Sequence, residues 1–361
     1  MVIRDMANWM LKAFAQRSIA ALPKPHFWNE LLQERVMHSL ELTEQRFNHS
    51  LSNCRIHLEQ FRRYGSTGRD SFSAFELGTG WFPVVPIGLF LSGAREVWTW
   101  DIAPLLKFNR LKLTIDRFLE LDQGQRLQDH LPIVPERVAA LRKVMTLFEY
   151  PRRLEPVQLL ERMSIHYLTG NASRSGLPPE TVDLIVSDVV LEFFSLEELY
   201  EILREFRRIV SPAGVMSHSI DLSDQYASFD AHITKFNFLR YSNWLWRLLN
   251  NPIIPLSRLR ISDYRRAFSD NGFHIVDESS VRGDPTELAR VPVAAQFREF
   301  PVDDLLVLYT SLAAVPLSER GGNRGPGGSN RWRRAKARFR PARDAALPSP
   351  PMADRCLSPA V

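Results

Sequence analysis

The chain has 361 residues, with 46 Lys and Arg against 41 Asp and Glu, and a formal net charge of +5. The excess lies in residues 319–361, whose net charge is +7, so residues 1–318 carry −2. A near-neutral body argues against a nucleic-acid binder held by a broad basic face. The two cysteines, Cys54 and Cys356, cannot build a disulfide framework or a zinc site, which favours a reducing, cytoplasmic setting. No apolar run reaches the roughly 20 residues of a membrane span, and we expect no signal peptide.

The sequence divides into three zones. In residues 1–70 apolar side chains recur at helical spacing, which predicts a helical N-terminal extension, either a lid or a packing segment. Residues 71–318 read as one folded domain. Residues 319–361 are rich in Arg, Pro and Gly without periodicity, which is typical of a disordered tail. Trp332 and Phe339 interrupt the basic run at 331–340, so contact with RNA or anionic lipid stays open beside a merely solvated tail.

Short apolar runs alternate with amphipathic stretches through the middle zone. The pattern predicts strands at residues 73–77, 96–100, 164–168, 182–187, 215–220, 273–278 and 305–312. It predicts helices at residues 83–92, 105–121, 136–148, 196–210 and 262–271. Ser195 and Glu198 form a capping-box pattern, and residues 211–214 suit a turn. The expected fold is α/β, a doubly wound, mostly parallel seven-stranded sheet covered on both faces.

The most informative segment is the turn after the first strand, Glu76-Leu77-Gly78-Thr79-Gly80. Gly78 permits a sharp turn there, and Gly80 lets a ligand approach the backbone. Asp101 ends the next strand, where a carboxylate can accept hydrogen bonds from both hydroxyls of a ribose. Together these features predict a ligand that contains adenosine.

Two such ligands compete at this turn. A dinucleotide site wants a third glycine where Phe82 and Pro83 stand, and Glu76 fits poorly beside a diphosphate. The Glu76 carboxylate suits a ligand with an ammonium group and a sulfonium. The residues therefore favour S-adenosylmethionine and leave a dinucleotide-dependent oxidoreductase as the alternative.

At these positions the chain resembles the class I S-adenosylmethionine-dependent methyltransferases, over roughly residues 71–315. The segments that carry the resemblance are Glu76–Gly80, Asp101, Asp183–Glu192 and Arg204–Gly214. It departs from the family pattern at Phe82, where a third glycine is usual, and at Phe193, where many relatives have His. The segment at residues 216–230, with residues 238–242, is similar to one bacterial branch of the family and implies no particular acceptor.

The resemblance implies a Rossmann-like fold, the cofactor S-adenosyl-L-methionine, and a transferase of class EC 2.1.1. Asp101 would bind the ribose, Ile102 would pack on adenine, and Asn171 would stand where relatives contact the adenine amino group. Asp188 would face the sulfonium and the substrate. The cofactor-binding set implied in this way is Glu76, Gly78, Thr79, Gly80, Asp101, Ile102, Asn171 and Asp188.

For the acceptor side we expect residues that follow the fifth strand. His218 has the ordinary pKa of a general base, although it could equally serve only to hold the loop. Asp221 could bind substrate or cap a turn. The aromatic stretch at 231–250, with Tyr241 and then Arg260, could cover an aromatic or anionic substrate, or form a helix packed on the sheet edge.

The sequence thus predicts a methyltransferase with a small-molecule acceptor, with His218 and Asp188 as the catalytic candidates. An NAD(P)-dependent oxidoreductase and a non-catalytic methyltransferase-like binding scaffold are the alternatives. No metal site is expected, and the sequence is silent on the acceptor atom and on oligomeric state.

Overall fold

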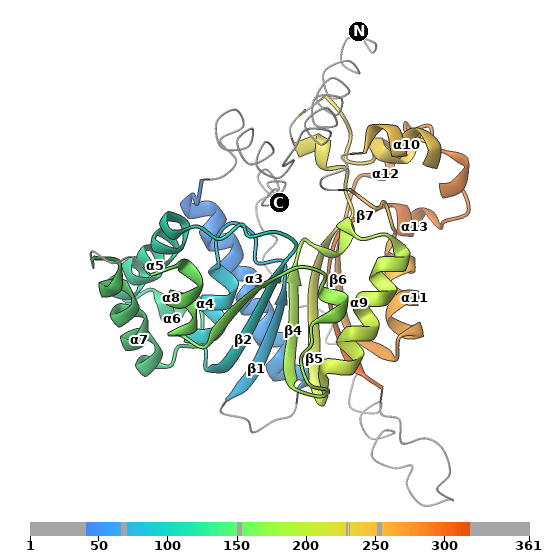
Figure 1. Ribbon diagram of the computed structural model, residues 1–361. Coiled ribbons are helices and arrows are strands. Elements are labelled where there is room, and N and C mark those ends of the chain that lie inside the picture. The colour runs from blue at the N-terminus through green and yellow to red at the C-terminus, as the bar shows by residue number, and fades with distance from the viewer. Residues whose placement is uncertain are drawn as a thin grey trace, which may run out of the picture.

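A computed structural model describes residues 41–65, 71–149, 154–228, 230, 232–250 and 255–317 (Figure 1). Seven strands form one sheet in the order β3-β2-β1-β4-β5-β7-β6. The first five strands pair in parallel, whereas β7 runs antiparallel between β5 and β6. The strands are β1 Phe72–Leu77, β2 Ala94–Asp101, β3 Ile165–Thr169, β4 Val182–Asp188, β5 Val210–Asp221, β6 Phe273–Arg282 and β7 Val307–Pro316. The predicted fold class is confirmed.

Helices connect the strands and cover both faces of the sheet (Figure 1). They are α3 Glu44–Tyr64, α4 Val84–Leu91, α5 Phe108–Gln123, α6 Leu127–His130, α7 Pro135–Thr146, α8 Pro156–Glu161, α9 Leu196–Ile209, α10 Asn243–Leu249, α11 Ile261–Asp270, α12 Pro285–Ala289 and α13 Val302–Leu305. The predicted capping box at Ser195 and Glu198 starts α9. Gly93 and Gly272 follow α4 and α11 with positive φ, a conformation common just after a helix C-terminus.

Successive strand residues point to opposite faces, so each central strand feeds two cores. On one face Ala74 and Val186 pack with α3, α4 and α5, while on the other Phe75 and Ile185 pack with α9 and α11. Because both faces are buried, β1 and β4 consist of continuous runs of buried residues rather than alternating ones. The sheet edge that carries the strand ends is therefore held rigidly from both sides.

Helix α3 belongs to this layered core. Its Phe47 and Leu51 are buried in the same cluster as α4, and its polar side chains reach β4, β5 and β7. We infer that residues 44–64 are part of the folded domain and not a detachable lid. The predictions for residues 1–40 and for the tail at 319–361 lie outside the described residues.

Residues 211–214 were predicted as a turn before the fifth strand, and that boundary is wrong. Strand β5 already begins at Val210, which pairs with Val182, and the register shifts before Leu184 pairs with Val215. The turn chemistry appears as an irregularity inside the strand. It brings the Ser211 hydroxyl within 3.1 Å of Asp183 Oδ1.

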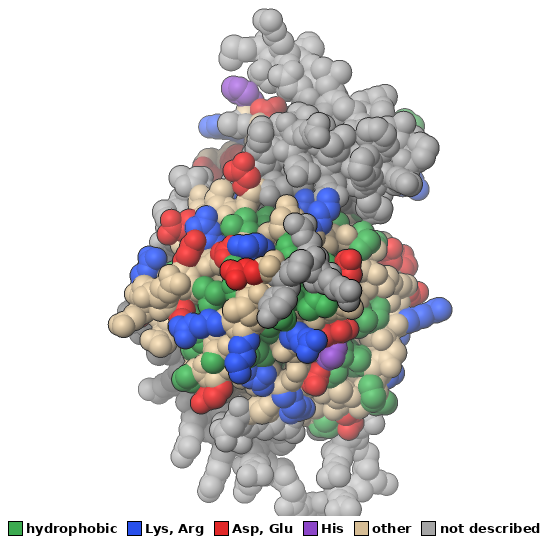
Figure 2. Space-filling view, turned by 60° about the vertical axis from the view of Figure 1, so that its left-hand side comes forward, with side chains coloured by type: hydrophobic (Ala, Val, Ile, Leu, Met, Phe, Trp, Pro, Cys, Tyr) green, Lys and Arg blue, Asp and Glu red, His purple; other side chains and the backbone are tan. Residues whose placement is uncertain are grey.

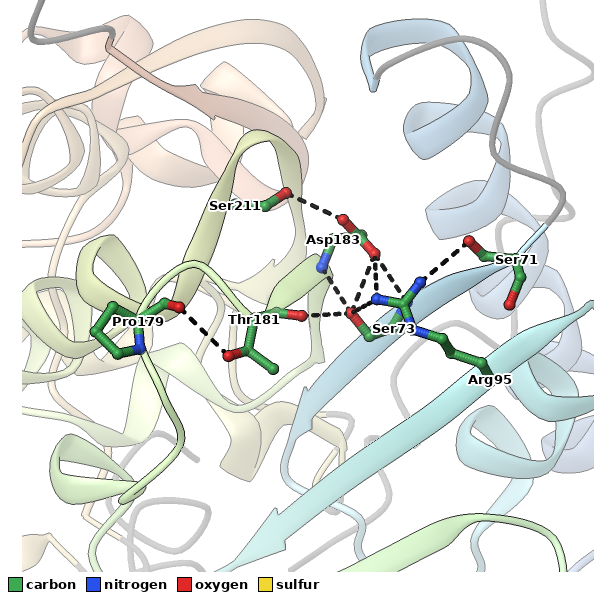
Figure 3. A network of polar contacts seen from close by, with 7 residues as sticks. All are labelled: Ser71, Ser73, Arg95, Pro179, Thr181, Asp183 and Ser211. Carbon is green, nitrogen blue, oxygen red and sulfur yellow. Dashed lines mark hydrogen bonds and ion pairs between the residues drawn. The ribbon is translucent and has the colours of Figure 1, made fainter.

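Asp183 ties four strands together near their amino ends (Figure 3). Its Oδ2 accepts hydrogen bonds from the backbone N–H and hydroxyl of Ser73 on β1, at 3.0 and 3.1 Å. The Arg95 guanidinium on β2 lies 3.2 Å from the same oxygen, and Ser211 on β5 donates to the other oxygen. This buried carboxylate is therefore a structural cross-link.

Beyond β7, the helices α10, α12 and α13 gather around a separate apolar cluster that includes Phe236, Phe238 and Trp246 (Figure 1). On the face of the molecule in Figure 2, the described basic and acidic side chains are interspersed and form no broad patch of one sign. Among the described helices, none has the length and apolar character needed to span a bilayer.

Candidate functional site

A cavity of about 500 Å³ opens at the carboxyl ends of β1, β2 and β4. Open α/β sheets bind ligands at this edge, where the strand order reverses. The cavity extends from Leu42 and Arg46 on one side to Glu198 and Glu201 on the other. All eight residues of the predicted cofactor-binding set line it: Glu76, Gly78, Thr79, Gly80, Asp101, Ile102, Asn171 and Asp188.

The β1 turn needs glycine at both positions, for different reasons. Gly78 has φ +86°, and a Cβ there would lie 2.3 Å from Cγ2 of Val190, so the turn is packed against the loop after β4. Gly80 has φ +66°, and a Cβ would meet nothing within 4 Å, so its backbone faces open space. A left-handed backbone beside open space is suited to the close approach of a ligand.

Asp101 fixes the loop beside that turn. Its Oδ2 accepts a hydrogen bond of 2.9 Å from the Gly80 N–H, and its Oδ1 lies 3.4 Å from the Ala103 nitrogen. Ile102 lines the cavity and is 68% exposed, so it presents an apolar surface on which a ligand could pack. Asn171 accepts a 2.9 Å hydrogen bond from the Ser173 N–H, so its amide oxygen also caps the short 3-10 helix Ala172–Arg174.

Glu76 is a buried carboxyl in the cavity wall. Burial raises its pKa to about 8, and the nearby charges of Asp188 and Asp101 add to the rise, while a hydrogen bond from Thr99 opposes it. The Thr79 and Thr99 hydroxyls are also hydrogen-bonded to one another. The ligand-free protein therefore holds Glu76 protonated near neutral pH, and a cationic ligand would favour its ionised form.

Asp188 ends β4 and also lines the cavity. Its Oδ2 accepts a 2.7 Å hydrogen bond from Asn53 Nδ2 on α3, whereas its buried Oδ1 has no hydrogen-bond partner among the described residues. The next residue, Val189, has φ +55°, which is a strained conformation for a β-branched side chain. A 2.9 Å hydrogen bond from its N–H to the Ser219 carbonyl maintains this conformation. Such strain is typical of functional sites.

His218 does not reach the cavity. Its ring is completely buried on the opposite face of the sheet, stacked on Phe206 and in edge contact with Phe268. Its Nδ1 lies 2.7 Å from the Ser187 hydroxyl, and burial lowers its pKa to about 3. Strand alternation explains the difference, because Ser217 and Ser219 face α3 while His218 faces α9. We infer that His218 is a structural residue.

The three predicted substrate-binding residues also lie outside this cavity. Asp221 Oδ1 accepts hydrogen bonds from the backbone and hydroxyl of Ser223, so it caps a turn. Tyr241 packs on Trp246 in the cluster beyond β7. Arg260 is fully buried and donates to the carbonyl oxygens of Leu222 and Val307 at 2.9 and 2.6 Å. The Arg260 guanidinium, which was expected to bind an anionic substrate, is thus hydrogen-bonded to backbone carbonyls instead.

Helix α3 also contributes to the site. Leu42, Arg46 and Ser50 line the cavity, and Asn53 contacts Asp188. Helical periodicity predicts the apolar face of this segment, but a single polar residue on a buried face has no local signature. On the far side Phe193, Phe194 and Ile202 also line the cavity. Among the described residues, no histidine lines the cavity. The same part of the chain contains no group of three or more His, Cys, Asp or Glu side chains that could hold a metal ion.

Comparisons with known proteins also point to a methyltransferase fold. Residues 138–217 match the family model described as methyltransferase domain. A search of curated proteins finds no match. Similar solved structures include a SAM-dependent methyltransferase from Methanosarcina mazei, with 11% identity, TM-score 0.40 and coverage of 72% of this chain and 97% of that one. Another is the geranyl diphosphate C-methyltransferase from Streptomyces coelicolor, with 12% identity, TM-score 0.40 and coverage of 73% and 80%.

A third is an S-adenosylmethionine-dependent methyltransferase from Mesorhizobium loti, with 12% identity, TM-score 0.38 and coverage of 72% and 95%. Similarity this low transfers no substrate to the present chain. The match over residues 138–217 includes β3, β4, α9 and the first two thirds of β5. Over these residues it bears out the methyltransferase resemblance that the sequence predicts.

Proposed function

We propose that this protein transfers the methyl group of S-adenosylmethionine to a small-molecule acceptor, in the cavity at the carboxyl ends of β1, β2 and β4. The observation that carries the proposal is the convergence of Glu76, Gly80, Asp101 and Asp188 on one cavity of about 500 Å³. These residues come from segments far apart along the chain, and the sequence alone predicts each of them as a cofactor-binding residue.

The residues present fit the cofactor. Gly80 offers open backbone, and exposed Ile102 offers an apolar surface for a base. Buried Asp188 Oδ1 has no hydrogen-bond partner among the described residues. Asp188 would supply negative charge for a cationic ligand, and Glu76 would add to it once the cation favours its ionised form. The cofactor would supply a methyl group already activated by positive sulfur. The protein would then bind, orient and exclude water, which is its main task in an in-line displacement.

Calorimetric titration tests the proposal directly. We expect S-adenosylmethionine and S-adenosylhomocysteine to bind and to raise the melting temperature, while NADH and NADPH do neither. Stabilisation by NADH without binding of either adenosyl compound would overturn the proposal in favour of an oxidoreductase.

A matched pair of variants locates the site. Asp101→Ala should weaken S-adenosylhomocysteine binding at least about tenfold, because it removes the predicted ribose acceptor and a loop contact. Asp270→Ala, an exposed carboxylate on α11, should leave the affinity unchanged. Equal effects of the two changes would exclude this cavity as the cofactor site. Turnover with candidate acceptors then separates an enzyme from a binding scaffold.

A further inference from the structure

The buried polar face of α3 lies between the cavity and the centre of the sheet. Asn53 bonds Asp188, His57 bonds the Ser217 hydroxyl, and Gln60 bonds Ser217 and Ser311. These contacts join segments far apart in the sequence, and Asn53 and Asp188 are separated by 135 positions. Within the described part of the chain, Asn53 is the one of these three residues that is hydrogen-bonded to a residue lining the cavity.

We propose that Asn53 is a positioning residue, whose side-chain amide holds the Asp188 carboxylate with one oxygen directed at the cofactor's sulfonium. The inference rests on the proposed function. Asn53 is only 4% exposed, and its Nδ2 lies 2.7 Å from Asp188 Oδ2 and 3.2 Å from His49 Nε2. The amide therefore fixes one carboxylate oxygen and leaves the other for a ligand.

The chemical type of the partner matters. A Lys or Arg at position 53 would orient Asp188 but would also neutralise its charge. A neutral amide orients the carboxylate and preserves its full negative charge toward the cavity. The strained Val189 and its bond to Ser219 fix the backbone on the other side of the same residue. Backbone and side chain of Asp188 are thus both held before a ligand arrives, which is the arrangement that electrostatic preorganisation requires.

The decisive measurement compares two ligands that differ in charge at sulfur. S-adenosylmethionine carries a sulfonium, whereas S-adenosylhomocysteine is neutral there. In Asn53→Leu we expect the affinity for S-adenosylmethionine to fall about tenfold, because a charged hydrogen bond contributes about that much. The affinity for S-adenosylhomocysteine should fall by about threefold or less, so the ratio of the two dissociation constants changes.

The matched control is Gln60→Leu, which lies beyond His57 and about two turns after Asn53 on the same buried face of α3. It removes a buried amide that bonds Ser217 and Ser311, so it should cost comparable stability and leave the ratio of the two affinities unchanged. Asn53→Ala removes the same amide without added bulk and carries the same expectation if the leucine variant fails to fold.

A double variant tests whether Asn53 acts through Asp188. If it does, Asn53→Leu should have little further effect on the ratio once Asp188→Asn is present. Equal losses for both ligands, or full additivity with Asp188→Asn, would overturn the positioning role and leave the proposed function intact. A wild-type protein that binds neither ligand would overturn the proposed function instead.

Discussion

The two ends of β4 carry aspartates in opposite situations. At the amino end, Asp183 accepts hydrogen bonds from Ser73, Ser211 and Arg95, and both of its oxygens are engaged. At the carboxyl end, Asp188 accepts one bond from Asn53 and leaves a buried oxygen without a partner among the described residues. Buried polar groups are normally satisfied, so an unsatisfied one needs an explanation. We therefore infer that the first carboxylate serves the fold, and the proposed function gives the second to a ligand.

The largest effect should come from the amino end. Asp183→Ala leaves the Ser73 N–H and the Ser211 hydroxyl without their acceptor, and we expect the free energy of unfolding to fall by about 3 kcal/mol. Urea denaturation measures this loss. The dissociation constant of S-adenosylhomocysteine for the folded variant should stay within about twofold of the wild type, because the network lies at the far end of β4 from the cavity. A selective loss of ligand affinity would remove the contrast between the two aspartates.

The carboxyl end should give the reverse result. Asp188→Asn should weaken S-adenosylmethionine binding about 10- to 100-fold, because it removes the charge that faces the sulfonium. The amide oxygen can still accept from Asn53, so the free energy of unfolding should change by less than about 1 kcal/mol. Titration calorimetry and urea denaturation on the same preparation check both parts. A variant that is strongly destabilised but binds normally would place Asp188 with Asp183.

The sequence predicted one of these roles better than the other. Chain order and glycine spacing indicated Gly78, Gly80 and Asp101, because a strand followed by a tight turn leaves a local pattern. The family resemblance implied Asp188. The cross-link through Asp183 depends on strand pairing and on the register shift opposite β5, which no local pattern encodes. Asn53 was missed for the same reason, since its partner lies 135 residues away.

The expectation for His218 failed because of strand alternation. It was placed with the residues that follow the fifth strand at the ligand-binding edge, yet one step along a strand moves a side chain to the other face of the sheet. Arg260 and Tyr241 show a second limit. Polar and aromatic residues near a site read as binding residues, but here an arginine satisfies backbone carbonyls between β5 and β7. Only tertiary structure distinguishes these uses.

The burial of His218 between Phe206 and Phe268 predicts how the stability of the protein depends on pH. The His218 pKa is about 3 in the folded protein and about 6.5 when unfolded, so the unfolded state binds more protons below pH 6.5. Stability should therefore fall as the pH drops from about 6.5 toward 3. Between pH 7.5 and pH 5, the free energy of unfolding of His218→Phe should fall by about 1–2 kcal/mol less than that of the wild type. Urea denaturation at each pH measures this difference.

The control for that experiment is Ser187→Ala, which removes the hydrogen bond to His218 and keeps the imidazole. Its sensitivity to acid should match that of the wild type. Glu76 in the cavity wall has the opposite effect on stability. Its raised pKa makes the folded state bind more protons between about pH 4.5 and 8, so its contribution to stability grows as the pH falls through this range. If His218→Phe and wild type lost equal stability on acidification, the buried imidazole would not be the source of the acid sensitivity.

The smallest effect should come from Arg95, the exposed partner of Asp183. Its side chain is 48% exposed, so solvent screens the ion pair and Arg95→Met should cost only about 0.5 kcal/mol of unfolding free energy. The serine and backbone donors would still satisfy both oxygens of Asp183. A loss as large as that of Asp183→Ala would mean that charge neutralisation, and not hydrogen bonding from Ser73 and Ser211, makes the buried carboxylate tolerable. The carboxylate at the amino end of β4 would then depend on a cation. The two ends of β4 would differ more strongly, because the hydrogen bond that Asp188 receives from Asn53 comes from a neutral amide.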